Sequence, residues 1–357
     1  MTTEENVLLG PLTTLGVGGP AKSMVRVHSE GDLVEALAFA RSQGLPVFVL
    51  GGGSNLLVGD GGFDGLVLRM EIDGALEFEE KDGAVEVRTA AGVDWDAFVL
   101  AVCERGLSGV ECLAGIPGLV GGTPVQNVGA YGQEVAETIV SVRVLDLATM
   151  EFVSLSAVEC GFGYRRSVFN STERGRYVVT AVTFRFPLGR RVELKYAELK
   201  RRFEGQSPTP IEVYGVVREI RHGKGMLLVP GEDDCRSAGS FFKNPVVDLA
   251  VYEAIAGAVG NPPRARSEPW VGHSVLTVPH WDAGGGKVKL AAAWLVEQAG
   301  FHKGFVMGRA GISSRHSLAV VNRGDATAGE IVALRDEIVR RVKERFGVRL
   351  EQEPVMV

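Results

Sequence analysis

Glycine is the feature that most constrains this chain. It supplies 47 of the 357 residues, nearly twice its usual share of about 7%. The surplus is concentrated in a few loops, above all "GGGSNLL" (residues 51–57) and "GIPGLVGGTPVQNVGAYG" (residues 115–132). Because glycine has no Cβ, such loops let a backbone approach another group closely. We therefore expect the loop backbones of this chain to enclose a ligand.

Composition narrows the class of protein. Hydrophobic residues make up 45% and charged residues 23% of the chain, which is typical of a soluble globular protein. The length predicts two or three domains. A net charge of −6 argues against a general nucleic-acid binder. The N-terminus lacks a signal-peptide pattern, and no apolar run approaches the length of a membrane span, so we predict a cytoplasmic protein without a membrane segment.

Cysteine and histidine give no sign of a metal site. The four cysteines are far apart and form no C-x-x-C pair, which predicts reduced thiols in a core. The six histidines form no H-E-x-x-H motif. A metal is therefore not expected.

The order of helix and strand signals predicts an α+β fold. A helix is expected from Ser29 to Gly44 and another from Asp94 to Gly106, with short strand-like runs between and after them. Two prolines in "SPTP" suggest a boundary near residue 208, beyond which the chain is more helical. We expect a first region at 1–207, divided near residue 70, and a second domain at 208–357.

The two glycine loops favour a large ligand. "GGGSNLL" follows a buried strand, so its backbone N–H groups can hold phosphate. It lacks the following helix of a dinucleotide fingerprint and the G-K-[ST] of a P-loop. From the residues alone, a diphosphate-binding loop and a plain tight turn both stay open. The second loop is uncharged and carries Gln126, Asn127 and Tyr131, and long loops inside compact domains are usually functional.

A third segment, "GSFFKNP", sets Ser240 between a glycine and two phenylalanines, with a lysine and an asparagine close behind. Read alone, this is a surface turn closed by Pro245, ahead of a helix capped by Asp248.

Taken together, the motifs resemble the UDP-N-acetylenolpyruvoylglucosamine reductases. The resemblance runs from about residue 13 to 353 through "TTLGVGGPA", "GGGSNLL", "GIPGLVGGTPVQNVGAYG", "CGFGYRRSVF", "SAGSFFKNP" and "AAAWLVEQAGFHKG". It implies an FAD-binding domain of the vanillyl-alcohol-oxidase (PCMH) type and a C-terminal α+β substrate-binding domain. It also implies NADPH-dependent reduction of UDP-N-acetylglucosamine enolpyruvate to UDP-N-acetylmuramate for peptidoglycan synthesis. The FAD would be held non-covalently by a protein that we expect to be a monomer.

The resemblance also assigns site residues. It makes Ser240 the proton donor to the substrate carbon and Arg165 the clamp on the substrate carboxylate. Substrate-binding residues would be Tyr196, Lys224 and Asn244. The FAD-binding residues would be Gly51, Gly52, Gly53, Ser54, Asn55, Leu56, Gly115, Ile116, Pro117, Gly118, Gly121, Gly122, Thr123, Gln126, Asn127 and Gly129.

A catalytic glutamate is expected near the C-terminus, where the family has L-E-P-E and this chain has "LEQEPVMV". In an extended strand Glu351 and Glu353 lie on the same side, so alternation does not choose between them. Pro354 keeps Glu353 extended, and counting from Leu350 favours Glu353. The alternative is that both are solvent-facing charges of an edge strand.

Two other functions stay open. One is an FAD-linked alcohol or sugar oxidase of the same flavin fold, although neither glycine loop has a histidine for covalent flavin attachment. The other is a non-catalytic protein that binds a nucleotide sugar.

Overall fold

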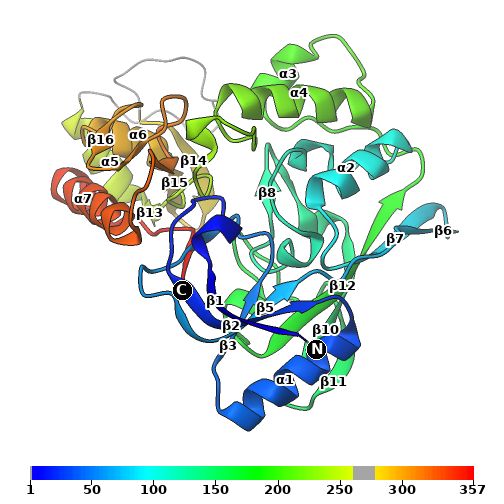
Figure 1. Cartoon of the computed structure of the whole chain (residues 1–357). Helices are drawn as coiled ribbons and strands as arrows, with labels where there is room; N and C mark the ends of the chain where they lie inside the picture. Colours follow the sequence, from blue (N-terminus) through cyan, green and yellow to red (C-terminus); the bar gives the residue numbers. More distant parts are fainter. Residues whose placement is uncertain (1, 260–277) are drawn as a thin grey trace. The chain divides into compact units, whose positions relative to one another are not determined.

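The computed structural model describes residues 2–259 and 278–357 (Figure 1). The chain forms two compact units, each built from three separate chain segments. Unit 1 comprises Met1–Leu12, Pro20–Gly53 and Gly62–Leu228. Unit 2 comprises Thr13–Gly19, Ser54–Gly61 and Val229–Val357.

The first sheet of unit 1 has the strand order β1-β2-β5-β3. Its strands are β1 (Thr3–Leu8), β2 (Pro20–Val27), β3 (Val47–Leu50) and β5 (Phe63–Met70). Strand β1 runs antiparallel to β2, whereas β2 and β3 run parallel to β5. Helix α1 (Glu30–Gln43) contributes Leu33 and Leu37 to the core against this sheet.

The predicted bounds of the first helix are confirmed. The Ser29 hydroxyl accepts a hydrogen bond from the backbone N–H of Asp32 at 3.0 Å, and Gly44 ends the helix in the left-handed conformation. Both are standard helix caps.

The second sheet of unit 1 is antiparallel throughout, with the order β11-β10-β12-β7-β6. Its strands are β6 (Glu77–Lys81), β7 (Ala84–Ala90), β10 (Ile139–Asp146), β11 (Glu151–Ser156) and β12 (Tyr177–Pro187). Helix α2 (Trp95–Glu104) begins at the predicted cap Asp94. Its Trp95 and Phe98 pack with Phe184 of β12 in the core.

The prolines near residue 208 begin a helix. Thr209 and Glu212 form a capping box, and Pro210 is the first residue of α4 (Pro210–Gly223). Proline suits this position because the first helical N–H has no partner within the helix. Helix α4 packs on α2 and, with the short α3 (Ala197–Arg202), belongs to unit 1, whose last segment ends at Leu228.

In the part of unit 2 that the structure describes, small sheets are combined with three α-helices. One sheet has the order β13-β15-β14, and a second has β16-β17-β18. The strands are β13 (Val246–Asp248), β14 (His280–Gly284), β15 (Lys287–Leu290), β16 (Val306–Met307), β17 (Ala310–Ile312) and β18 (Val320–Asn322). The helices are α5 (Leu249–Ala258), α6 (Ala292–Gln298) and α7 (Ala328–Phe346).

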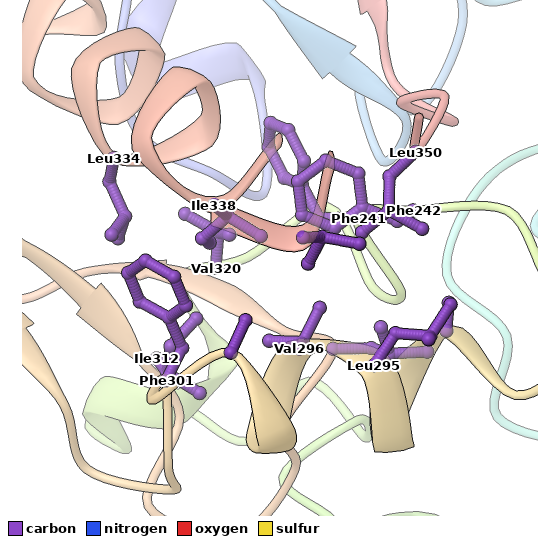
Figure 2. Close-up of a cluster of buried hydrophobic side chains, with 14 of the residues drawn as sticks. Phe241, Phe242, Leu295, Val296, Phe301, Ile312, Val320, Leu334, Ile338 and Leu350 are labelled. Carbon is purple, nitrogen blue, oxygen red and sulfur yellow. The ribbon is translucent and has the colours of Figure 1, made fainter. Parts of the chain in front are cut away.

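The core of unit 2 draws on all three of its chain segments. Leu15, Val17 and Leu57 pack in the same cluster as residues from α6 and α7. Figure 2 shows this cluster around Phe241 and Phe242. Strand β4 (Leu56–Leu57) also pairs in parallel with β19 (Val355–Met356). The expected α+β fold is confirmed.

All four cysteines lie among the described residues, where they are buried and form no disulfide. Across the described ranges 2–259 and 278–357, none of the helices is both long and apolar enough to cross a membrane.

Candidate active site

The second glycine loop is anchored at its start by two helices. The backbone N–H of Gly115 donates to Asp96 Oδ1 of α2 at 2.6 Å, and its carbonyl accepts from Arg221 Nε of α4 at 3.0 Å. Gly115 has φ +67°, and a Cβ there would lie 2.8 Å from Leu227 Cδ1. Only glycine fits this conformation and this space without strain.

The two glycine loops meet within unit 1. A Cβ on Gly52 would lie 2.7 Å from the Cα of Gly118, so the two backbones are in direct contact. The second loop is fixed there because Gly118 O accepts from Trp95 N at 3.0 Å. The predicted cofactor residues Gly51–Gly53 lie in unit 1, whereas Ser54, Asn55 and Leu56 belong to unit 2.

Two predicted cofactor residues, Asn127 and Thr123, use their side chains to bond the loop or the segment that follows it. Asn127 is buried, and its amide donates to Glu134 Oε2 at 2.7 Å and accepts from Ala136 N at 3.1 Å. The Thr123 hydroxyl donates to Val120 O at 2.8 Å. These side chains therefore fix the shape of the loop.

A cavity of about 230 Å³ opens beside the first glycine loop. It is lined by Gly51, Gly52, Arg69, Met70, Glu71, Asp73, Gly92 and Leu119. Pockets for drug-sized ligands measure roughly 300–1,000 Å³, so this cavity alone is too small for a whole dinucleotide.

Arg69 gives this cavity an unsatisfied donor. Its Nε donates to Glu71 Oε1 at 2.6 Å, whereas its buried Nη1 has no hydrogen-bond partner. Buried polar groups are nearly always paired in folded proteins. An unpaired guanidinium N–H beside a close glycine contact fits the phosphate and ring acceptors of FAD.

Arg165 lies in a tight turn next to the second loop. Gly163 and Arg166 bond each other's backbones, and Arg165 between them has φ +53°. The half-buried guanidinium donates from Nη2 to Gly129 O at 2.6 Å. A left-handed conformation is strained for a residue other than glycine and recurs at functional sites. The turn is tied to the loop, since Asn127 also donates to Gly163 O at 3.1 Å.

Tyr196 and Lys224, two of the three residues that the resemblance assigns to substrate binding, lie close together in unit 1. Tyr196 precedes α3 and Lys224 follows α4. Lys224 Nζ lies 3.3 Å from Tyr196 Oη and 3.3 Å from Glu198 Oε2. The ring of Tyr131 meets that of Tyr196 edge-on at 5.1 Å, and Lys224 Nζ lies 5.3 Å from each ring centre.

This cluster keeps its positive charge. Burial lowers the pKa of Lys224, but Tyr131, Tyr196 and Glu198 together outweigh that effect, so the pKa lies above its ordinary value. Arg221 interacts with Tyr131 of the same cluster. Burial lowers the pKa of its guanidinium, which stays charged because arginine titrates far above neutral pH. A cationic amine framed by phenol groups is suited to bind phosphate oxygens.

Ser240 is held in unit 2 between two chain segments. Phe241 N donates to Leu318 O at 2.8 Å, and Phe241 O accepts from Glu353 N at 2.9 Å. The rings of Phe241 and Phe242 are fully buried in the core, where they pack edge-on at 5.4 Å (Figure 2). They therefore fix the backbone on which Ser240 sits.

The partner of Ser240 is a histidine that the sequence did not single out. The Ser240 Oγ lies 3.3 Å from Nε2 of His316, which is in the loop between β17 and β18. His316 is 76 residues away in sequence, and its local pattern carries no sign of this contact. Arg69, Tyr131 and Arg221 were likewise not assigned to the site, although Tyr131 stands out in the second glycine loop.

The two C-terminal glutamates differ in exposure. The Glu351 side chain is 78% exposed and reaches Lys243 Nζ only at 3.9 Å. Glu353 is half-buried, and its carbonyl accepts from Asn55 Nδ2 at 3.4 Å. Between them, Gln352 forms a single bridge to Phe242, so a regular strand begins only at β19.

Asn244 is oriented by a helix. Its Oδ1 accepts a hydrogen bond from the N–H of Ala292, the first residue of α6, at 3.0 Å.

Two family models match the chain. An FAD binding domain matches residues 21–156, and the C-terminal domain of UDP-N-acetylenolpyruvoylglucosamine reductase matches residues 230–357. The reductase of that name from Thermobifida fusca is 44% identical, with 100% of this chain and 99% of the relative covered. That from Nocardia farcinica is 45% identical, with 100% and 90% covered.

The crystal structure of UDP-N-acetylenolpyruvylglucosamine reductase from Thermus caldophilus is also similar. It matches with a TM-score of 0.62 and 30% identity, covering 100% of this chain and 99% of that one. On this evidence the chain belongs to the UDP-N-acetylenolpyruvoylglucosamine reductase family.

Proposed function

We propose that this chain is an FAD-dependent oxidoreductase that reduces UDP-N-acetylglucosamine enolpyruvate to UDP-N-acetylmuramate with NADPH. The observation that carries the proposal is the relationship to named reductases along the whole chain, at 44% identity. A match confined to the FAD-binding region would support only a flavoprotein.

FAD would be held by the backbones of the two glycine loops and by Arg69. When bound, FAD would supply the redox chemistry by which hydride from NADPH reaches the substrate. The chain's own part there is to exclude water and to hold the ligand through close backbone contact, as the approach of Gly52 to Gly118 allows.

Arg165 and Ser240 would act on the enolpyruvyl group. Arg165 has a planar guanidinium whose parallel N–H groups match the two oxygens of a carboxylate. Such a contact stabilises the negative charge that develops next to the carboxylate as the double bond is reduced. Ser240 would donate its proton to the carbon that carries this charge, and Glu353 would assist the same step.

Tyr196, Lys224 and Asn244 would hold the diphosphate of the UDP-sugar. The positive cluster around Lys224 has the charge and the hydroxyl donors for this task.

The function is tested with the purified protein loaded with FAD. We expect a flavin absorption band that NADPH bleaches without oxygen and that returns on addition of the enolpyruvyl sugar. Acid denaturation should release the flavin. A missing flavin band would overturn the proposal, and recovery of colour with oxygen alone would point to the oxidase.

Arg69→Met is expected to weaken FAD binding about 10-fold or more, because one hydrogen bond to a charged group contributes roughly 1.5–3 kcal/mol. The dissociation constant is measured on the apoprotein by quenching of flavin fluorescence. Arg88→Met, on the exposed face of β7, is the control. Equal constants in both variants would remove Arg69 from the FAD site.

Tyr196→Phe is expected to weaken binding of the UDP-sugar by about 10- to 150-fold, while the rate of chemistry changes less. The variant lacks the hydroxyl, 3.3 Å from Lys224, that would bond to the charged diphosphate. A hydrogen bond to a charged group is worth roughly 1.5–3 kcal/mol. Calorimetric titration gives the dissociation constant. If it is unchanged, this cluster does not bind the diphosphate.

We further propose a monomeric, cytoplasmic enzyme of cell-wall precursor synthesis. Its four cysteines are buried and form no disulfide in the described structure, which suits a reducing compartment. Size-exclusion chromatography with light scattering tests the monomer.

A further inference from the structure

If Ser240 is the proton donor, the donor and the acceptor of its hydrogen bond with His316 are fixed. A hydroxyl group has one proton and two lone pairs. For Ser240 to protonate a substrate carbon, that proton must point at the carbon and not at the imidazole. The 3.3 Å contact is then a hydrogen bond in which Nε2–H of His316 donates to Oγ.

The loop that carries His316 is fixed by its own backbone. The hydroxyl of the buried Ser313 accepts from the N–H groups of Arg315 and His316, at 3.0 and 3.2 Å. The carbonyl of His316 accepts from Ala319 N at 3.1 Å.

The same loop is tied to the segment of Ser240. Leu318 O accepts from Phe241 N at 2.8 Å, one residue beyond the serine. This backbone hydrogen bond holds the segment of Ser240 beside the loop of His316.

We propose that His316 is a positioning residue for the protonation step. It orients the Ser240 hydroxyl through Nε2–H and stabilises the alkoxide that remains when the proton leaves. In that step the Ser240 O–H bond breaks, a C–H bond forms on the substrate, and the alkoxide regains a proton from water. The inference rests on the proposed role of Ser240.

The expected effect follows from the change in charge. As Oγ becomes negative, the hydrogen bond from His316 becomes charge-assisted and therefore stronger. Removing one preorganised donor to a developing oxyanion costs roughly 100- to 1,000-fold in rate. Reduction of the flavin by NADPH involves no alkoxide and should be unchanged.

The experiment measures both half-reactions by stopped flow in the FAD-loaded enzyme. His316→Leu should slow reoxidation by the enolpyruvyl sugar roughly 100- to 1,000-fold. His316→Gln, which keeps an N–H donor, should recover most of that loss. His302→Leu, at an exposed histidine of unit 2, is the matched control and should match the parent. If His316→Leu does not fold, His316→Asn replaces it, because its amide is too short to reach Oγ.

A double-mutant comparison separates this inference from the role of Ser240. With Ser240 replaced by alanine, adding His316→Leu should cause no further loss, because His316 acts through that hydroxyl. Reoxidation that is slow in Ser240→Ala but near the parent rate in His316→Leu would contradict the inference, as would two losses that add. Either result would overturn the role of His316 and leave that of Ser240 intact. If Ser240→Ala itself turns over at the parent rate, the proposed role of Ser240 fails first.

Discussion

Ser240→Ala is expected to divide the reaction into an intact half and a failed half. NADPH should still bleach the flavin, because that step requires no protonation of the substrate. Reoxidation by the enolpyruvyl sugar should slow to or beyond the upper end of the roughly 100- to 10,000-fold range that general acids contribute. Anaerobic stopped-flow spectroscopy of the flavin band measures both rates in one protein.

The intact half-reaction serves as the internal control for folding and FAD binding. An alanine at this position leaves the buried Phe241 and Phe242 untouched, so the core of unit 2 is retained. If the variant reoxidises at a rate near that of the parent, Ser240 is a structural turn residue.

Glu353→Gln should also slow reduction of the substrate while flavin reduction stays nearly intact. The matched control is Glu351→Gln, two residues earlier, and it should have little effect. The difference in burial favours Glu353 over Glu351 as the active carboxylate, since the Glu351 side chain is 78% exposed and Glu353 is half-buried. A carboxylate that acts on a substrate needs a site with little water, where its charge has a stronger effect.

Steady-state and half-reaction rates of the two glutamine variants are compared with the parent. The reverse pattern would transfer the role to Glu351. Two silent variants would show that neither carboxylate takes part in the chemistry.

Local patterns in the sequence predicted the elements with clear boundaries. Ser29 and Gly44 bound α1, and Asp94 begins α2, because caps act within one helical turn. The glycine loops were also identified correctly as places of close backbone approach, as Gly52 against Gly118 shows. By contrast, the prolines near residue 208 suggested a domain boundary, but in the structure they begin α4 within unit 1.

Contacts across long stretches of chain could not be predicted in this way. Ser240 meets His316 because Phe241 pairs with Leu318, and no local periodicity encodes that pairing. Arg69 likewise reads as an ordinary strand residue until the fold places it beside the first glycine loop. The resemblance to a family supplied Tyr196 and Lys224, whose proximity depends on the ends of two different helices.

The discontinuous build of unit 2 has a consequence for synthesis on the ribosome. Leu15, Val17 and Leu57 pack in a core with residues of α7, and Leu56–Leu57 pairs with Val355–Met356. About 300 residues separate the two partner strands, which at roughly 5–20 residues per second takes roughly 15 to 60 s. For that time the early apolar segments of the nascent chain lack their partners. The order of translation, more than the strength of any single contact, sets when unit 2 can first form.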